Sequence, residues 1–132
     1  MPLSVMVDHD RRWLVVRATG CTTIDEMVNL IRTVRAQIAH RMTPMLFDAT
    51  GATTDATDED VRRAVAAVRQ AIAEGGMRGH VALVADDDTF YARLLSYETE
   101  CAESGVRVIR AFRQVPDAER WLQIVSSARH FH

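Results

Sequence analysis

Short apolar runs alternate along the chain with longer segments whose apolar residues recur at helical spacing. Two runs rich in β-branched residues come first, over residues 3–7 and 13–19, and a polar turn between them predicts a β-hairpin. Apolar runs at 45–47, 81–85 and 106–112 predict three further strands, of which 81–85 is apolar on both faces and therefore central. Arg107, Arg110 and Arg113 accompany the last strand, which places it near an edge of the sheet. These arginines form a stripe that is either simply solvated or meets an acidic partner or a phosphate.

Helical periodicity fills the segments that lie between and after these strands. Thr23 with Glu26 predicts a capping box, from which a helix is expected to run to about Ala39. Thr57 with Asp60 predicts a second cap, the acidic residues 86–88 lead into a third helix, and Pro116 suits the first turn of a fourth. The order ββαβαβαβα predicts an α/β fold, with a mostly parallel sheet of about five strands and four helices.

Length and composition limit the possible functions. The 132 residues predict one domain, 1–132, with a core over 11–125 and a frayed tail over 126–132. A net charge of −2 provides no basic field, so we expect no nucleic-acid partner. The start resembles no signal peptide and no apolar run is long enough for an integral membrane segment, so a cytoplasmic protein is expected. All 16 basic residues are arginine, which excludes lysine-dependent chemistry.

Few residues carry a pattern typical of catalysis. Cys21 and Cys101 are expected at opposite edges of the sheet, unbonded and each buried as a small apolar residue. No histidine stands in a nucleophile motif. We therefore expect neither an enzyme nor a bound cofactor or metal.

Carboxylates follow two of the predicted strands. Asp48 ends one strand, and Asp86, Asp87 and Asp88 follow another, so parallel pairing would place all four at the carboxyl edge of the sheet. Such carboxylates could hold Mg²⁺ in an Asp-based, metal-dependent enzyme, which would require them to converge within a few ångströms. The simpler interpretation is helix capping and solvation, because no lysine is present to support phosphoryl transfer.

The succession of elements resembles the STAS domain, the fold of bacterial anti-sigma-factor antagonists. It is still more similar to bacterial STAS-like proteins related to the Sec14 lipid-binding fold. The resemblance covers roughly residues 11–122 and is carried by the hydrophobic pattern with a few fixed polar points, at 46–51, 81–85, 91–93, 106–112 and 118–122. It implies a single STAS-like domain that acts as a regulatory protein-binding module.

The antagonists also suggest a phosphoacceptor. In them a strand that ends in Asp is followed by a loop and by Asp-Ser at a helix start, and a partner kinase phosphorylates that serine. Here the matching stretch reads Asp55-Ala56-Thr57-Asp58, so Thr57 is the nearest hydroxyl. The residues leave three interpretations open. Thr57 is either a plain N-cap or a phosphoacceptor, or the acidic residues around it give the surface a permanent negative charge like that of a phosphorylated one.

We therefore expect a non-enzymatic module that binds a protein partner through its carboxyl-edge loops, and an exposed sheet edge that is compatible with a homodimer. The expected partner-binding residues are Asp48, Thr50, Asp55, Asp58, Asp86, Asp87 and Asp88. The alternative is a carrier or sensor of a small apolar or lipid-like ligand. It requires a cavity on the order of several hundred Å³, lined by Val65, Val68, Phe90 and Leu94.

Overall fold

The fold comes from a computed structural model in which residues 3–35, 42–76 and 78–128 are described. The strands in these ranges are β1 (Leu3–Asp8), β2 (Trp13–Ala18), β3 (Cys21–Thr22), β4 (Met45–Asp48), β5 (Thr53–Thr54), β6 (Val81–Val84) and β7 (Ile109–Phe112). The helices are α1 (Ile24–Leu30), continued by the π-helical turn η1 (Ile31–Arg35), and then α2 (Asp58–Ala73), α3 (Asp88–Glu103) and α4 (Val115–Ala128).

Five strands form the main sheet, in the order β1-β2-β4-β6-β7. β1 and β2 make the expected antiparallel hairpin, and β2, β4, β6 and β7 pair in parallel. Each parallel neighbour is reached through one helical crossover, as the alternation of strands and helices predicts. The sheet thus confirms the predicted α/β class, and β7 lies at an edge as its arginines suggest.

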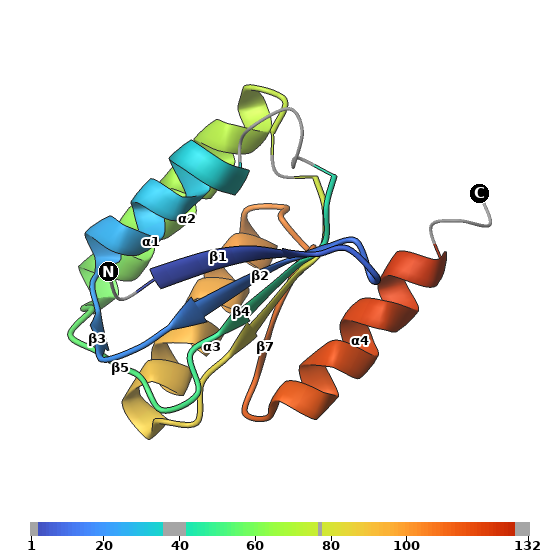
Figure 1. The fold of residues 1–132 in the computed structure, drawn as a ribbon. Helices are drawn as coiled ribbons and strands as arrows, with labels where there is room; N and C mark the ends of the chain where they lie inside the picture. The colour runs from blue at the N-terminus through green and yellow to red at the C-terminus, as the bar shows by residue number, and fades with distance from the viewer. Residues whose placement is uncertain (1–2, 36–41, 77, 129–132) are drawn as a thin grey trace.

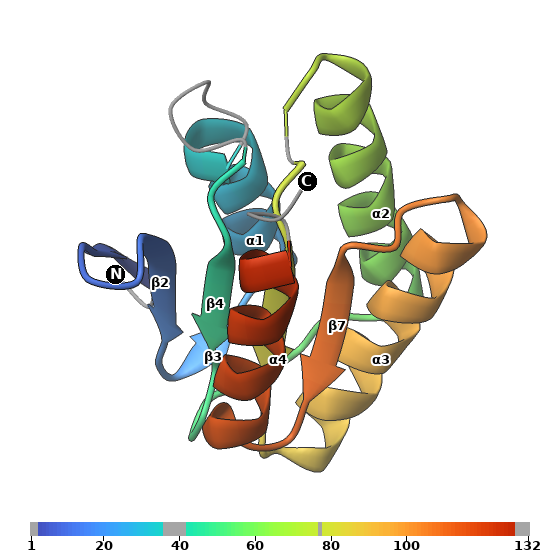
Figure 2. The same ribbon diagram turned by 90° about the vertical axis from the view of Figure 1, so that its right-hand side faces the viewer.

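The sheet lies between two unequal layers of helices. α1, α2 and α3 cover one face, and α4 lies alone on the other (Figures 1 and 2). β4 and β6 are covered on both faces, so all of their residues are buried. No helix in the described part of the chain combines the length and the apolarity that crossing a membrane requires.

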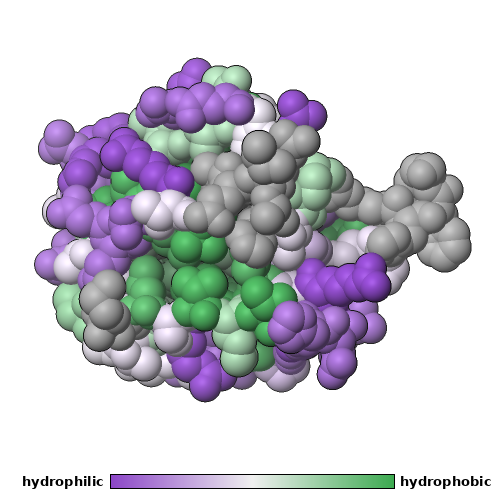
Figure 3. Space-filling model, turned by 45° about the horizontal axis from the view of Figure 1, so that its top comes forward, coloured by the Kyte–Doolittle hydropathy of each residue, from purple (hydrophilic) through white to green (hydrophobic). Residues whose placement is uncertain are grey.

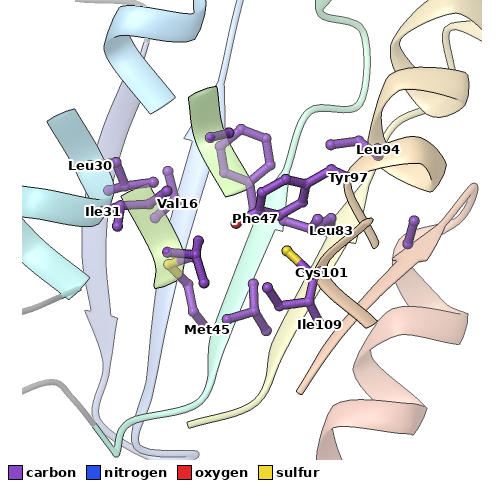
Figure 4. Packing of buried hydrophobic residues seen from close by; sticks show 14 of the residues in the cluster. Val16, Leu30, Ile31, Met45, Phe47, Leu83, Leu94, Tyr97, Cys101 and Ile109 are labelled. Atoms are coloured by element: carbon purple, nitrogen blue, oxygen red, sulfur yellow. The ribbon is translucent and has the colours of Figure 1, made fainter. Parts of the chain in front are cut away.

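Alternate residues of the inner strands supply two separate cores. On the three-helix side, Phe47 and Leu83 pack toward Leu94 and Tyr97 of α3 (Figure 4). On the other side, buried strand residues pack against Ala118 and Leu122 of α4. Burial of a side chain as large as Leu or Phe contributes ~1.5–3 kcal/mol, so these two apolar layers supply the main stabilisation of the fold.

Several boundaries differ from those expected. α1 ends at Leu30 and continues as η1 to Arg35, and the rest of the helix expected to Ala39 lies outside the described residues. The last strand begins at Ile109 instead of residue 106, because the stretch before it forms the turn that follows α3. α4 runs to Ala128, so residues 126–128 are helical and were wrongly assigned to the tail; residues 129–132 lie outside the described part.

Candidate functional site

The ends of β2, β4, β6 and β7 meet along one side of the sheet, which we call the carboxyl edge. The strand register places Arg17 beside Asp48, and Asp48 beside Val84. The Asp48 side chain is 13% exposed, and its carboxylate accepts the Thr50 N–H at 3.0 Å and lies 3.8 Å from the Arg17 guanidinium. Asp48 therefore shapes the loop after β4, and little of its carboxylate is left open to a partner.

Hydrogen bonds join the loop after β4 to those after β6 and β7. Gly51 has a φ of 80°, a left-handed conformation that suits glycine, and its N–H donates to Asp86 Oδ1 at 2.9 Å. Arg113, just after β7, donates to the Asp86 carbonyl at 2.9 Å and to Asp88 Oδ1 at 2.8 Å. The three loops are thereby fixed relative to one another, whereas Arg113 was expected to be part of a solvated stripe.

The three aspartates after β6, Asp86 to Asp88, each bind a different partner. Asp86 holds Gly51, Asp88 pairs with Arg113, and Asp87 is the N-cap of α3, where its carboxylate accepts the Phe90 N–H at 2.9 Å. No group of three or more potential metal-ligating side chains occurs among the described residues. The convergence that an Asp-based metal enzyme requires is therefore not found at these positions.

Thr57 begins α2 with a complete capping box. Its Oγ1 accepts the Asp60 N–H at 3.2 Å, and Asp60 Oδ2 accepts the Thr57 N–H at 3.0 Å, which confirms the predicted cap. The Thr57 N–H is the main cause that lowers the pKa of Asp60, with a smaller contribution from Arg63, 3.6 Å away. Thr57 itself is exposed at the surface, so a hydroxyl with a structural role is also accessible.

Arg93 of α3 connects that helix to the start of α2, at the carboxyl edge. Its Nε donates to the Ala56 carbonyl at 2.9 Å and its Nη1 contacts Asp58 Oδ1 at 2.5 Å. Arg93 was not expected as a site residue, because its partners lie more than thirty positions away in the sequence. The remaining acids of this loop, Asp55 and Glu59, are exposed and no contact holds them within the described part of the chain.

A second, two-stranded sheet that was not expected from the sequence extends the carboxyl edge. β3 and β5 pair in parallel, so that Cys21 lies beside Thr53 and Thr22 beside Thr54. The Thr53 N–H donates to the Gly20 carbonyl at 2.9 Å, and the Thr54 hydroxyl donates to the Thr22 carbonyl at 2.7 Å. The only signal was the β-branched threonines themselves, since two-residue strands show no periodicity.

The apolar groove expected beside α3 is almost filled. Phe90 and Leu94 line a cavity of about 20 Å³, together with Ile24, Met27, Thr54, Ala56, Val61, Ala64, Arg93 and Tyr97. That volume admits about one water molecule. Val65 and Val68 are buried in the core and do not line this cavity. The predicted ligand cavity of several hundred Å³ at these four residues is therefore wrong, because the helices pack too closely.

The two cysteines occupy different environments. Cys101 is fully buried in α3 as expected, and burial raises the pKa of its thiol to about 11. Cys21, in β3, is exposed, so its predicted burial is wrong. The small β3–β5 sheet lies outside the main sheet and carries Cys21 toward solvent. Both thiols are free.

Comparisons with known proteins concern the fold. No protein-family model and no curated protein gives a significant match to the chain. Among solved structures it is similar to an uncharacterised protein of the DUF3478 family from Shewanella loihica PV-4, described as having a SpoIIAA-like fold. The two share 16% sequence identity and a TM-score of 0.53, and the match covers 91% of each chain. The chain therefore has the SpoIIAA-like, or STAS, fold that its sequence pattern resembles.

Proposed function

We propose that the protein is a cytoplasmic, non-enzymatic binding module that recognises a partner protein through its carboxyl edge. The observation that carries the proposal is the set of bonds between loops. The loop after β4 is held by Asp86, and the loops after β6 and β7 are joined by Arg113. Such bonds hold the exposed side chains in place before a partner arrives, which lowers the entropy lost on binding.

The charge of this surface indicates the chemistry of the partner. The loop before α2 and the first turn of α2 contain Asp55, Asp58, Glu59 and Asp60, and Asp55 and Glu59 have no cation of their own within the described residues. Two exposed threonines, Thr50 in the loop after β4 and Thr57 just before α2, can donate or accept hydrogen bonds. A partner surface rich in arginine or lysine would be attracted to this edge and oriented by it.

Two other functions are less compatible with this geometry. A metal-dependent enzyme would need carboxylates that share a ligand, and here each is occupied by a backbone N–H, by an arginine or by solvent. A carrier of apolar molecules would need an open interior, and the cavity beside Phe90 and Leu94 has a volume of only about 20 Å³.

The proposal is tested by removing charge from this edge without disturbing the contacts inside the protein. The double variant Asp55→Asn/Glu59→Gln neutralises two exposed carboxylates, and Asp10→Asn/Glu103→Gln makes the same change of charge at the opposite end of the sheet, in the turn before β2 and at the end of α3. Each immobilised protein is incubated with an extract of the source cells. We expect one protein to be captured by the wild type and by the second variant, and lost with the first. Identical capture by all three proteins would contradict recognition through this edge.

Thr57 is the phosphoacceptor in this proposal. The variant Thr57→Asn separates its two roles, because asparagine caps a helix well but has no hydroxyl to phosphorylate. We expect intact-mass measurement of protein isolated from the source cells to find a phosphorylated fraction in the wild type and none in Thr57→Asn. A phosphorylated fraction that persists in the variant would place the modification on another residue.

A further inference from the structure

The two edges of the main sheet are protected very differently. β7 forms one edge and has only four residues, among them the exposed Arg110. The N–H of Ala111 on this strand is already occupied, since it donates to the Glu98 carboxylate at 2.6 Å. Short length, charge and a covered N–H are the features that keep an edge strand from pairing with another chain.

β1 forms the other edge and has none of these features. It pairs with β2 over all six residues without a bulge, and no strand of the described chain pairs with its opposite side. Its residues from Leu3 to Val7 carry no charge, and Val5, Met6 and Val7 are 43%, 62% and 41% exposed. Figure 3 shows hydrophobic side chains gathered at the surface along this edge of the sheet.

The exposure of β1 follows from the position of the helices. Leu3, Val5 and Val7 lie opposite Ala18, Val16 and Leu14 of β2, and residues opposite each other in an antiparallel pair share a face. These three partners are buried beneath the three-helix layer, whereas Val5 and Val7 are exposed. The apolar face of the sheet therefore continues one strand beyond the helices that cover it.

We propose that β1 pairs with β1 of a second copy of this chain. In an antiparallel pair with a two-fold axis at Val5, Val5 lies opposite Val5 of the second copy and Leu3 opposite its Val7, so apolar residues meet on the three-helix side. The strand is neutral over this stretch, and the one carboxylate at its end, Asp8, is bound by Arg11 at 2.8 Å. Charge therefore neither opposes the pairing of two copies nor provides recognition for a basic or acidic foreign strand.

Charge placed on the axis tests this pairing. We expect analytical ultracentrifugation to find wild-type dimers in the micromolar range, and Val5→Lys and Val5→Glu each to sediment as monomers, because like charges meet. An equimolar mixture of these two variants should regain dimers. Ile124→Lys and Ile124→Glu, at a 62% exposed position on α4, are the matched controls and should remain dimeric. If the wild type is monomeric throughout this range, the proposal is overturned, even if β1 is then found to bind a strand of another protein.

Cysteine crosslinking tests the register of the β1–β1 pair. It does not require the protein to tolerate a charged residue at position 5. In a Cys21→Ser background, Val5→Cys places two thiols directly opposite each other, at a Cα separation of about 4.5–5.5 Å that a disulfide can bridge. Met6→Cys faces Ser4 of the second copy, so its two thiols lie too far apart. We expect mild oxidation to produce covalent dimers of Val5→Cys and few of Met6→Cys. The reverse result, or equal crosslinking, would overturn the pairing at Val5.

Discussion

The capping box at Thr57 permits a quantitative prediction. Thr57→Ala removes the hydroxyl that accepts the Asp60 N–H at 3.2 Å, and leaves the backbone N–H of Thr57 bound to Asp60. Loss of an N-cap side chain costs about 1 kcal/mol. α2 contributes Val61, Ala64, Val65 and Val68 to the main core, so fraying of its first turn should reduce the free energy of unfolding of the whole domain.

Chemical denaturation followed by far-UV circular dichroism measures this loss. The midpoint should fall while the dependence on denaturant concentration stays the same, and the melting temperature should fall by about 4 °C for a domain of this size. Thr57→Asn keeps an acceptor oxygen at the N-cap and should be close to the wild type. Thr89→Ala, at an exposed threonine in the first turn of α3, is the matched control and should not destabilise the domain.

Two results would refute this reasoning. If Thr57→Ala unfolds at the wild-type midpoint, the bond between Thr57 and Asp60 does not stabilise α2. If Thr57→Asn is destabilised as much as Thr57→Ala, the loss arises from another contact of the threonine side chain, and the N-cap explanation is wrong.

Three further predictions concern the core, an acidic group and the thiols. Leu94→Ala enlarges the cavity of about 20 Å³ beside α3, and calorimetry should find the domain destabilised by ~3 kcal/mol; a loss below ~1 kcal/mol would mean that the helices close over the gap. The pKa of Asp60 is lowered from 3.8 in the folded protein, so its ionised carboxylate stabilises the fold above that pH, and this stabilisation is lost as the pH falls through the folded-state pKa. In denaturant titrations, the destabilisation caused by Asp60→Asn should therefore be largest near neutral pH and vanish in acid. A thiol reagent at neutral pH should modify Cys21 rapidly and Cys101 only after unfolding, because burial raises the pKa of Cys101 to about 11; rapid reaction of both would contradict the packing of α3.

The sequence predicted the features of the fold that depend on neighbouring residues. The capping pairs Thr23 with Glu26 and Thr57 with Asp60 are each three positions apart, and both were found. The uninterrupted apolar run at 81–85 identified a strand covered on both faces. Such features are visible because the physical cause, either a hydrogen bond to a nearby N–H or burial of a whole strand, acts within one element.

The candidate site depended on contacts that the sequence does not reveal. Asp86 and Gly51 are 35 positions apart, and Arg93 lies 37 positions from the carbonyl of Ala56 that it binds. Asp86 was predicted to lie at the carboxyl edge, but its partner was not predicted, since tertiary packing selects one among many exposed donors. The size of the cavity beside Leu94 is equally hidden, because it depends on how closely three helices approach one another.

The bond between Glu98 and the N–H of Ala111 has a consequence for how far association can proceed. If both edges of the sheet were open, copies could join end to end without limit and grow into fibrils. With β7 closed, pairing through β1 uses the open strand of each copy and leaves only closed strands on the outside. The bond from Glu98, with the short length of β7 and the charge of Arg110, would thus limit the proposed assembly to two copies.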